Sequence, residues 1–256
     1  MSEARGFRAA VSFLTRVPAD HGSAGDLPAS ISWFPVVGGL VGLSIGLTFV
    51  ASREVLPPFV AATVAVAFGV FVTGALHEDG LADSADALAG GRDREEALRI
   101  LRDPRHGTFG VLAILVSLLL RVGSVAALGR WEAVAALASA HALSRGAAVS
   151  LTATVRPAAS DGLGASFAGA ARVGRVWAGA VVAAAVAALL MGVWAVPALS
   201  AVALGTAAVA RLSLGKIGGV TGDVAGAAEQ VTEVLVLVLS AAVTANGWGT
   251  LPWWRG

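Results

Sequence analysis

Long apolar segments alternate with short polar segments along almost the whole chain. Seven of the apolar stretches are long enough, or nearly so, to cross a bilayer as helices. The expected spans are about residues 36–51, 59–76, 111–128, 131–149, 176–193, 197–212 and 231–244. The pattern predicts an all-α fold, a polytopic integral membrane helical bundle of about seven transmembrane helices. We expect one membrane-embedded domain over residues 1–256.

Glycines in the first expected span recur at helical spacing. Gly38, Gly42 and Gly46 are each four residues apart, so they lie on one face of a helix. Small residues at this spacing let two membrane helices approach closely. We therefore interpret these glycines as a packing face.

Composition supports a membrane protein and excludes several other classes. The chain is 56% hydrophobic and 14% charged, with a mean hydropathy of +0.78, whereas about a quarter of the residues in a soluble domain are charged. The absence of Cys excludes disulfides and thiolate metal sites. A net charge of +1 argues against a general nucleic-acid-binding protein.

Lys and Arg predict the orientation of the bundle. They are concentrated on the connections that share a side with the N-terminus, and cytoplasmic connections normally carry this excess. We expect a cytoplasmic N-terminus and a C-terminus outside. The polar segments then placed on the cytoplasmic side are 77–107, 151–174 and 215–230.

An acidic cluster follows the second expected span. Glu78, Asp79, Asp83 and Asp86 fall within nine consecutive positions. In a helix, the three Asp side chains would share one face and repel one another unless a cation is bound. Mg²⁺ takes such oxygen ligands and commonly joins carboxylates to a phosphate group. The alternative is a solvated acidic helix start, where carboxylates favour the N-terminal dipole.

Arginines and glycines continue this segment. Arg92, Arg94 and Arg105 lie close to glycines in the chain, where backbone N–H groups and guanidinium groups can hold phosphate together. Arg92 could instead pair with an acidic neighbour in a solvated helix. Asp103 could complete a metal shell or cap a helix.

A second glycine-rich segment, residues 218–227, contains Asp223. Glycine lets bare backbone approach a ligand closely, and an Asp directly before a membrane span is costly unless it is used. The same argument applies to Arg145 and, less strongly, to Glu229 and Glu233, which lie within or directly before expected spans. These residues are therefore further site candidates.

His77, directly after the second expected span, and His141, within the fourth, receive different interpretations. His77 lies beside the carboxylates and could act as a base. For His141, a satisfied structural histidine is the interpretation that we favour.

Two other functional classes fit parts of the pattern. CDP-alcohol phosphotransferases and prenyltransferases also place Asp-rich motifs at the membrane face, but the Ala-Arg that follows the motif in the first group is absent after Gly80. A transporter could use the intramembrane Arg121, Arg145 and Asp223 as a substrate path. Against this reading, the acidic cluster lies at a membrane edge and no half-to-half repeat is visible.

The motifs together resemble the cobalamin synthase family, whose members are adenosylcobinamide-GDP ribazoletransferases. The resemblance is carried by the polar and glycine-rich motifs at both ends and in the middle of the chain. They are residues 13–18, 74–86, 90–94, 103–110 and 221–227. It covers nearly the whole chain, although the 151–174 segment shows no family signature.

The resemblance implies a Mg²⁺-dependent enzyme of the bacterial inner membrane. It would join adenosylcobinamide-GDP to α-ribazole or its 5′-phosphate and release GMP. The lipid bilayer is its other implied partner, no nucleic acid is expected, and a homo-oligomer or an association with other cobalamin-pathway enzymes is left open.

The resemblance also implies roles for individual residues. Asp79, Asp83 and Asp86 would hold Mg²⁺ on the diphosphate, with Glu78 assisting, and His77 or one carboxylate would accept the hydroxyl proton. Arg92, Arg94 and Arg105 would neutralise the departing GMP. The remaining candidates for substrate binding are Arg16, Asp103, Arg145, Lys216 and Asp223.

Overall fold

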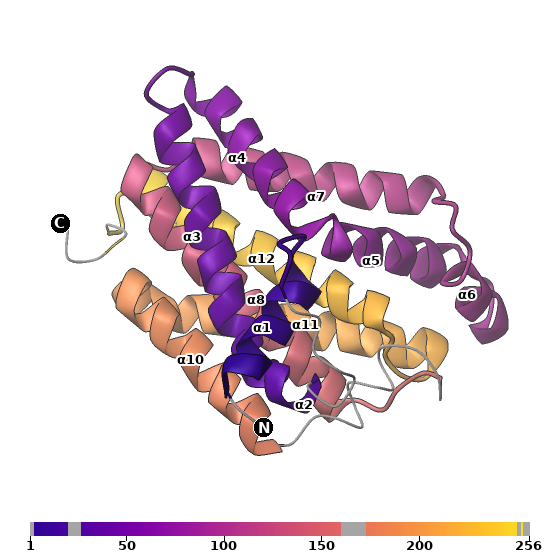
Figure 1. The fold of residues 1–256 in the computed structure, drawn as a ribbon. Coiled ribbons are helices and arrows are strands. Elements are labelled where there is room, and N and C mark those ends of the chain that lie inside the picture. The colour runs from indigo at the N-terminus through magenta and orange to yellow at the C-terminus, as the bar shows by residue number, and fades with distance from the viewer. Residues whose placement is uncertain (1–2, 20–26, 160–172, 250–251, 253–256) are drawn as a thin grey trace.

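The computed structural model describes residues 3–19, 27–159, 173–249 and 252. Its described residues are almost entirely helical, with one isolated β-bridge between Pro157 and Val220. The helices pack as one bundle (Figure 1). In chain order they are α1 (Glu3–Leu14), α2 (Leu27–Ser30), η2 (Ile31–Trp33), α3 (Phe34–Ser52), α4 (Pro58–Thr73), α5 (Leu76–Ala85), η3 (Asp86–Gly90), α6 (Arg94–Ile100), α7 (Thr108–Ala126), α8 (Arg130–Thr154), α10 (Val173–Met191), η4 (Gly192–Trp194), α11 (Ala195–Ile217) and α12 (Gly222–Ala245).

The predicted all-α membrane bundle is confirmed. Each expected span is centred on one long helix: α3, α4, α7, α8, α10, α11 or α12. Among the described residues, five stretches are long and apolar enough to be candidate spans. A sixth is added if the bent pair Pro58–Thr73 and Leu76–Gly90 counts as one span. One of the five stretches is Val173–Ile217, whose 45 residues include both α10 and α11. The number of seven crossings stays a prediction.

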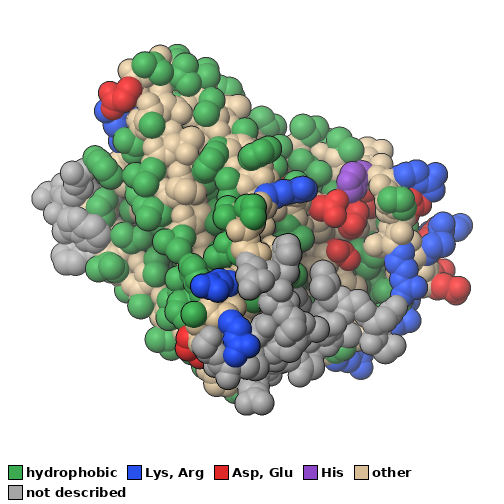
Figure 2. Space-filling view, viewed as in Figure 1, with side chains coloured by type: hydrophobic (Ala, Val, Ile, Leu, Met, Phe, Trp, Pro, Cys, Tyr) green, Lys and Arg blue, Asp and Glu red, His purple; other side chains and the backbone are tan. Residues whose placement is uncertain are grey.

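Helix α8 forms the centre of the bundle, and α7 lies at its edge. In their apolar windows, 83% of α8 but only 33% of α7 is buried. The outward face of α7 exposes Leu112, Val116 and Leu119. Figure 2 shows hydrophobic side chains covering much of the surface over α3, α4 and α10. Such a surface suits contact with lipid, where backbone polar groups are satisfied inside each helix.

Helix α3 packs closely against α8 through the predicted glycine face. A Cβ atom on Gly38 or Gly42 would overlap the carbonyl oxygen of His141 or Leu137, and one on Gly46 would lie 2.7 Å from the Cα of Val134. Only residues without a side chain allow this approach. The interpretation of these glycines as a packing face is confirmed.

The second expected span ends earlier than predicted. Helix α4 stops at Thr73 because Gly74 and Ala75 both adopt the left-handed conformation, with φ of 67° and 58°. This conformation costs a non-glycine residue about 1–2 kcal/mol. The chain bends by 91° at this break, so α5 carries the acidic cluster away from the axis of α4.

Candidate active site

A close crossing of α5 and α12 positions the acidic groups. Gly80 of α5 faces Gly226 of α12, and a Cβ on Gly80 would lie 2.9 Å from the carbonyl oxygen of Asp223. The two backbones therefore touch at residues that lack side chains. This crossing brings Asp223 close enough to Asp79 and Asp83 for the three carboxylates to repel one another.

Asp79, Asp83 and His106 form a candidate metal-binding group. His106 lies in the turn before α7, with Nε2 3.6 Å from Asp79 Oδ1 and Nδ1 3.3 Å from Asp83 Oδ1. One ligand atom from each residue lies within 4.8 Å of the others. The side chain of Asp79 is 64% exposed, whereas that of Asp83 is 17% exposed. Figure 2 shows acidic side chains and a histidine together on this face.

The donor atoms of this group fit Mg²⁺ through the carboxylates. Mg²⁺ prefers oxygen ligands and keeps several waters, and the exposure of Asp79 leaves room for them. An imidazole nitrogen is a more usual ligand for transition metals. Asp79 and Asp83 are therefore the residues best suited to hold Mg²⁺, with His106 beside them.

Asp86 contacts the start of α7 with both carboxylate oxygens. The backbone N–H of Gly107 donates to Oδ2 at 2.6 Å, and that of Gly110 donates to Oδ1 at 2.9 Å. Carboxylates stabilise helix N-termini by accepting such bonds. The structure therefore places Asp86 outside the group of Asp79, Asp83 and His106, although it belongs to the same segment. Its contacts hold the turn that carries His106 against α5.

Glu78 lies in a buried charge network at the centre of the bundle. Arg121 Nη1 of α7 donates to Glu78 Oε1 at 2.7 Å, and Arg121 Nε lies 2.8 Å from Glu233 Oε1 of α12. All three side chains are at most 8% exposed. Buried charges persist when they are paired, so Glu78 is placed as a partner of Arg121 and not with the exposed carboxylates.

Arg145 of α8 supplies the second cation of this buried charge network. Its Nη1 donates to Glu233 Oε2 at 3.0 Å, contacts Glu229 Oε1, and lies 2.6 Å from His141 Nδ1. His141, Glu229 and Glu233 have ligand atoms close enough to hold a metal ion. The guanidinium group already lies among those atoms, so Arg145 is the cation at this position. His141 has a partner on Nδ1, as expected for a structural histidine, whereas its buried Nε2 has no hydrogen-bond partner among the described residues.

His77 connects the buried charge network to the site. Its Nδ1 lies 3.7 Å from Glu229 Oε2, and the residue is 7% exposed. A carboxylate next to an imidazole nitrogen can orient the ring and fix its tautomer. Because His77 and Asp79 line the same cavity, His77 stays a candidate proton acceptor beside the carboxylates.

Two of the predicted phosphate-binding arginines pair with acidic neighbours. Arg92 Nε donates to Glu96 Oε2 at 2.9 Å, and Arg105 Nη2 donates to Asp103 Oδ2 at 2.8 Å. The hydrogen bonds from these arginines hold the pKa of the Glu96 and Asp103 carboxyl groups at about 2. The structure therefore supports the alternative reading for Arg92, and it pairs Asp103 with Arg105 and not with the metal group.

The remaining predicted cations lie at three different places. Arg94 donates to the carbonyl oxygens of Ile217 and Ala158 at 3.0 and 2.9 Å, which ties α6 to the end of α11. Arg16 lies with its guanidinium against Gly74, at the break between α4 and α5. Lys216 is in the last turn of α11. In the 151–174 segment, residues 160–172 lie outside the described part.

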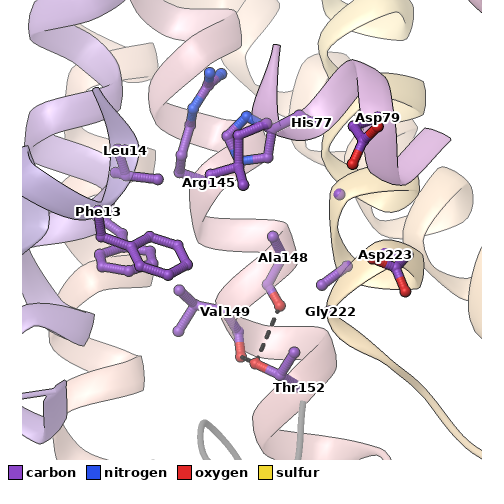
Figure 3. Close-up of a pocket in the computed structure, with 14 residues that line it drawn as sticks. Phe13, Leu14, His77, Asp79, Arg145, Ala148, Val149, Thr152, Gly222 and Asp223 are labelled. Atoms are coloured by element: carbon purple, nitrogen blue, oxygen red, sulfur yellow. Dashed lines mark hydrogen bonds between the residues drawn. The ribbon is translucent and has the colours of Figure 1, made fainter. Parts of the chain in front are cut away.

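A cavity of about 230 Å³ opens beside the carboxylates (Figure 3). Its polar wall carries His77, Asp79, Arg145 and Asp223. The opposite wall is apolar and comes from α1, α3, α5 and α8. The apolar lining includes Phe13, Leu14, Phe34, Leu76, Ala148 and Val149. One end of the cavity can therefore bind an apolar group, while the other end is lined by charged side chains.

Sequence reasoning assigned no individual role at the site to His106, Phe13 or Phe34; the sequence predicts Phe34 to be part of an interfacial anchor, but it is 5% exposed. His106 stands inside the polar turn 103–110, and that position was the only available signal. Phe13 and Phe34 stack with ring centroids 5.4 Å apart, although 21 positions separate them in the chain. Nothing in local spacing connects two aromatic residues of different helices.

The geometry suits transfer of a phosphate-linked group. Exposed carboxylates can hold a divalent metal on a phosphate, and a buried histidine lies two residues away on the same helix. The cavity next to them can hold the acceptor molecule in a defined orientation.

Comparisons with known proteins agree with this chemistry. The family model described as cobalamin-5-phosphate synthase matches residues 6–241. The chain is 42% identical over 241 residues to the adenosylcobinamide-GDP ribazoletransferase of Bradyrhizobium diazoefficiens, a match that covers 92% of each chain. Proteins with the same name from Mesorhizobium japonicum (41% identity, 91% of this chain and 92% of the relative) and Chlorobaculum tepidum (38%, 92% and 94%) are also similar. No solved structure matches the chain.

Proposed function

The chain belongs to the cobalamin-5-phosphate synthase family, and from that membership we propose how its site at the α5–α12 crossing carries out the family reaction. The protein is an adenosylcobinamide-GDP ribazoletransferase of late cobalamin synthesis, as its relatives are named. The observation that carries the proposal is the match over residues 6–241, which includes every polar segment of the site.

In the proposed reaction, a ribose hydroxyl of α-ribazole or its 5′-phosphate attacks the phosphorus attached to cobinamide. The new bond joins the ribose oxygen to this phosphorus. The bond from the same phosphorus to the oxygen bridging to GMP breaks, GMP leaves with that oxygen, and the hydroxyl proton passes to a base. The products are adenosylcobalamin, or its 5′-phosphate, and GMP.

Asp79 and Asp83 would hold Mg²⁺ on the diphosphate, and His106 lies within reach of both. Bound Mg²⁺ would neutralise the diphosphate and stabilise the leaving group. Asp223 contributes a third carboxylate from α12 at the same edge. Without a cation these carboxylates would repel the anionic substrate, which is the physical reason to expect a metal requirement.

His77 is the residue that we assign to proton acceptance. It lines the cavity, it lies two residues from Asp79, and Glu229 lies next to its Nδ1. Arg145 is the cation that lines the cavity, and Arg16 lies at the α4–α5 break with its guanidinium against Gly74. Arg92, Arg94 and Arg105 donate to protein groups, and the exposed Arg92 and Arg105 would use their further N–H donors to contact GMP.

GMP release by the purified protein tests this proposal. We expect release only when adenosylcobinamide-GDP, α-ribazole and Mg²⁺ are all present, and loss of release after chelation with recovery on adding Mg²⁺. Release of CMP from a CDP-alcohol substrate would instead identify a different phosphotransferase. No turnover with any of these substrates would contradict the assignment as an enzyme.

A further inference from the structure

The cavity beside the carboxylates has two walls of different chemistry. Figure 3 shows Phe13 and Leu14 on one side and Asp79 and Asp223 on the other, with α8 behind them. The acidic wall belongs to the site described above. The apolar wall has no part in phosphate or metal binding, so it calls for a separate explanation.

Three of the four helices that form the apolar wall, α1, α3 and α8, supply the aromatic and aliphatic side chains considered next. Phe13 of α1 stacks on Phe34 of α3, with their planes 21° apart. Val149 of α8 also lines the cavity, belongs to the same apolar cluster as Leu14 and Phe34, and is 6% exposed. The hydroxyl of Thr152, which also lines the cavity, donates to the carbonyl of Val149 at 2.9 Å in its own helix. Among the described lining residues, this end therefore offers flat apolar surface and little hydrogen bonding.

Size limits what can enter. Sites for drug-sized ligands occupy roughly 300–1,000 Å³, and this cavity has about 230 Å³. A single fused-ring base fits such a space, whereas a corrin macrocycle does not. The bulk of the corrinoid must therefore lie outside the cavity.

Chemistry separates the candidate ring systems. Guanine carries several donors and acceptors, and burying them against Phe13, Phe34 and Val149 would leave them without partners at a cost of about 1–3 kcal/mol each. The dimethylated benzimidazole base of α-ribazole has two methyl groups and no exocyclic donor. Aromatic side chains favour such flat apolar rings through stacking.

We infer that the wall formed by Phe13, Leu14, Phe34 and Val149 is the binding site for the benzimidazole base of α-ribazole. This inference rests on the proposed function and assigns one of its two substrates to a place in the cavity. With the base against this wall, the attached ribose extends toward Asp79, Asp223 and His77. The attacking hydroxyl then faces the edge where the diphosphate is expected, which fixes the orientation of attack.

Inhibition of the wild-type protein by the free base, 5,6-dimethylbenzimidazole, provides the first test. We expect competitive inhibition against α-ribazole and no competition against adenosylcobinamide-GDP. This measurement needs no variant, so a folding defect cannot obscure it. Competition with the corrinoid substrate, or no inhibition at all, would overturn the inference.

Two substitutions locate the site. Val149→Trp fills the cavity, and it should weaken α-ribazole binding at least about tenfold while the KM for adenosylcobinamide-GDP stays unchanged. Phe13→Ala removes a stacking surface and should weaken α-ribazole binding by roughly 5- to 150-fold. The affinity of Phe13→Leu for α-ribazole should lie between those of Phe13→Ala and the wild type. Val116→Trp is the matched control, because Val116 is 54% exposed on the outer face of α7.

Binding is measured by equilibrium dialysis of α-ribazole alone, and KM values are measured by GMP release. If the wild type releases GMP but Val149→Trp raises the KM for the corrinoid instead, the base site is elsewhere and the proposed function stands. If the wild type releases no GMP with both substrates and Mg²⁺, the proposed function fails. Dialysis then still reports whether α-ribazole occupies this wall.

Discussion

At the residue scale, Asp83 and Asp86 lie three positions apart and have different partners. Asp83 lies next to His106 and shares it with the exposed Asp79, whereas Asp86 accepts two backbone N–H groups at the start of α7. The side chains are chemically identical. Their surroundings therefore assign one to the candidate metal group and the other to holding a helix terminus.

Asn substitutions separate these two roles. We expect Asp83→Asn to reduce GMP release by at least about 100-fold, because a group that stabilises transition-state charge is lost, and to raise the Mg²⁺ concentration needed for activity. Its Tm in detergent should change little. Glu95→Gln on the exposed face of α6 is the charge-matched control.

Asp86→Asn should give the opposite pattern. Asn keeps one acceptor oxygen, so the protein loses one charge-assisted bond to the N-terminus of α7 and about 1–2 kcal/mol of stability. The Tm in detergent should fall while the Mg²⁺ dependence of GMP release stays as in the wild type. A changed Mg²⁺ dependence would show that Asp86 also binds the metal.

At the element scale, the α5–α12 crossing assembles the site. Gly80 and Gly226 allow the helix backbones to touch, and the contact places Asp223 beside the carboxylates of α5. The left-handed Gly74 and Ala75 give α5 the direction it needs for this crossing. The close contact between α5 and α12 creates the acidic edge, because neither helix alone brings these carboxylates together.

Gly80→Ala tests the crossing. The added methyl would lie 2.9 Å from the carbonyl oxygen of Asp223, so the helices must separate. Overpacking of this kind costs about 1–3 kcal/mol, and we expect GMP release to fall more steeply than the Tm. The control is Gly123→Ala on α7, where a new Cβ would meet no described atom within 4 Å. It should be neutral or stabilising by up to about 1 kcal/mol.

At the scale of the whole molecule, the buried charge network joins α5, α7, α8 and α12. Arg121 and Arg145 lie among Glu78, Glu229 and Glu233, all at most 8% exposed. Removing one partner of a buried pair costs about 3–5 kcal/mol, because the remaining charge is uncompensated. The four helices must therefore stay packed together for each buried charge to keep its partner, and the loss of one partner destabilises their packing.

Arg121→Met should lower the stability by about 3–5 kcal/mol, measured by thermal unfolding in detergent. Adding Glu78→Gln removes one of the charges left unpaired, and the double variant should recover part of the loss. Additive effects of the two substitutions would show that Arg121 and Glu78 are not energetically coupled.

The orientation of the bundle can be tested because the chain contains no Cys. Two single variants place a Cys on opposite predicted sides of the membrane. Val55→Cys lies in the α3–α4 turn, where Val55 is 83% exposed. Arg99→Cys lies on α6, where the Arg99 side chain is 71% exposed. A membrane-impermeant maleimide added to intact cells should label Val55→Cys alone. Labelling of Arg99→Cys before permeabilisation would place the catalytic face outside.

Local patterns in the sequence determined the helical membrane fold and the approximate position of each span. They also located the acidic segment and, through the resemblance of its motifs, the family reaction. These features depend on neighbouring residues, because apolar length and helical spacing are properties of a continuous stretch. The break at Gly74–Ala75 was missed because glycine and alanine also occur within spans.

Only the tertiary structure decided the partner of each charged residue. Glu78 and Asp79 are adjacent, yet Glu78 pairs with Arg121 across the bundle and Asp79 faces His106 at the surface. The stacked Phe13 and Phe34 likewise meet from different helices. A carboxylate in water and one in a bundle interior have the same sequence signature, and long-range packing alone determines which environment each one occupies.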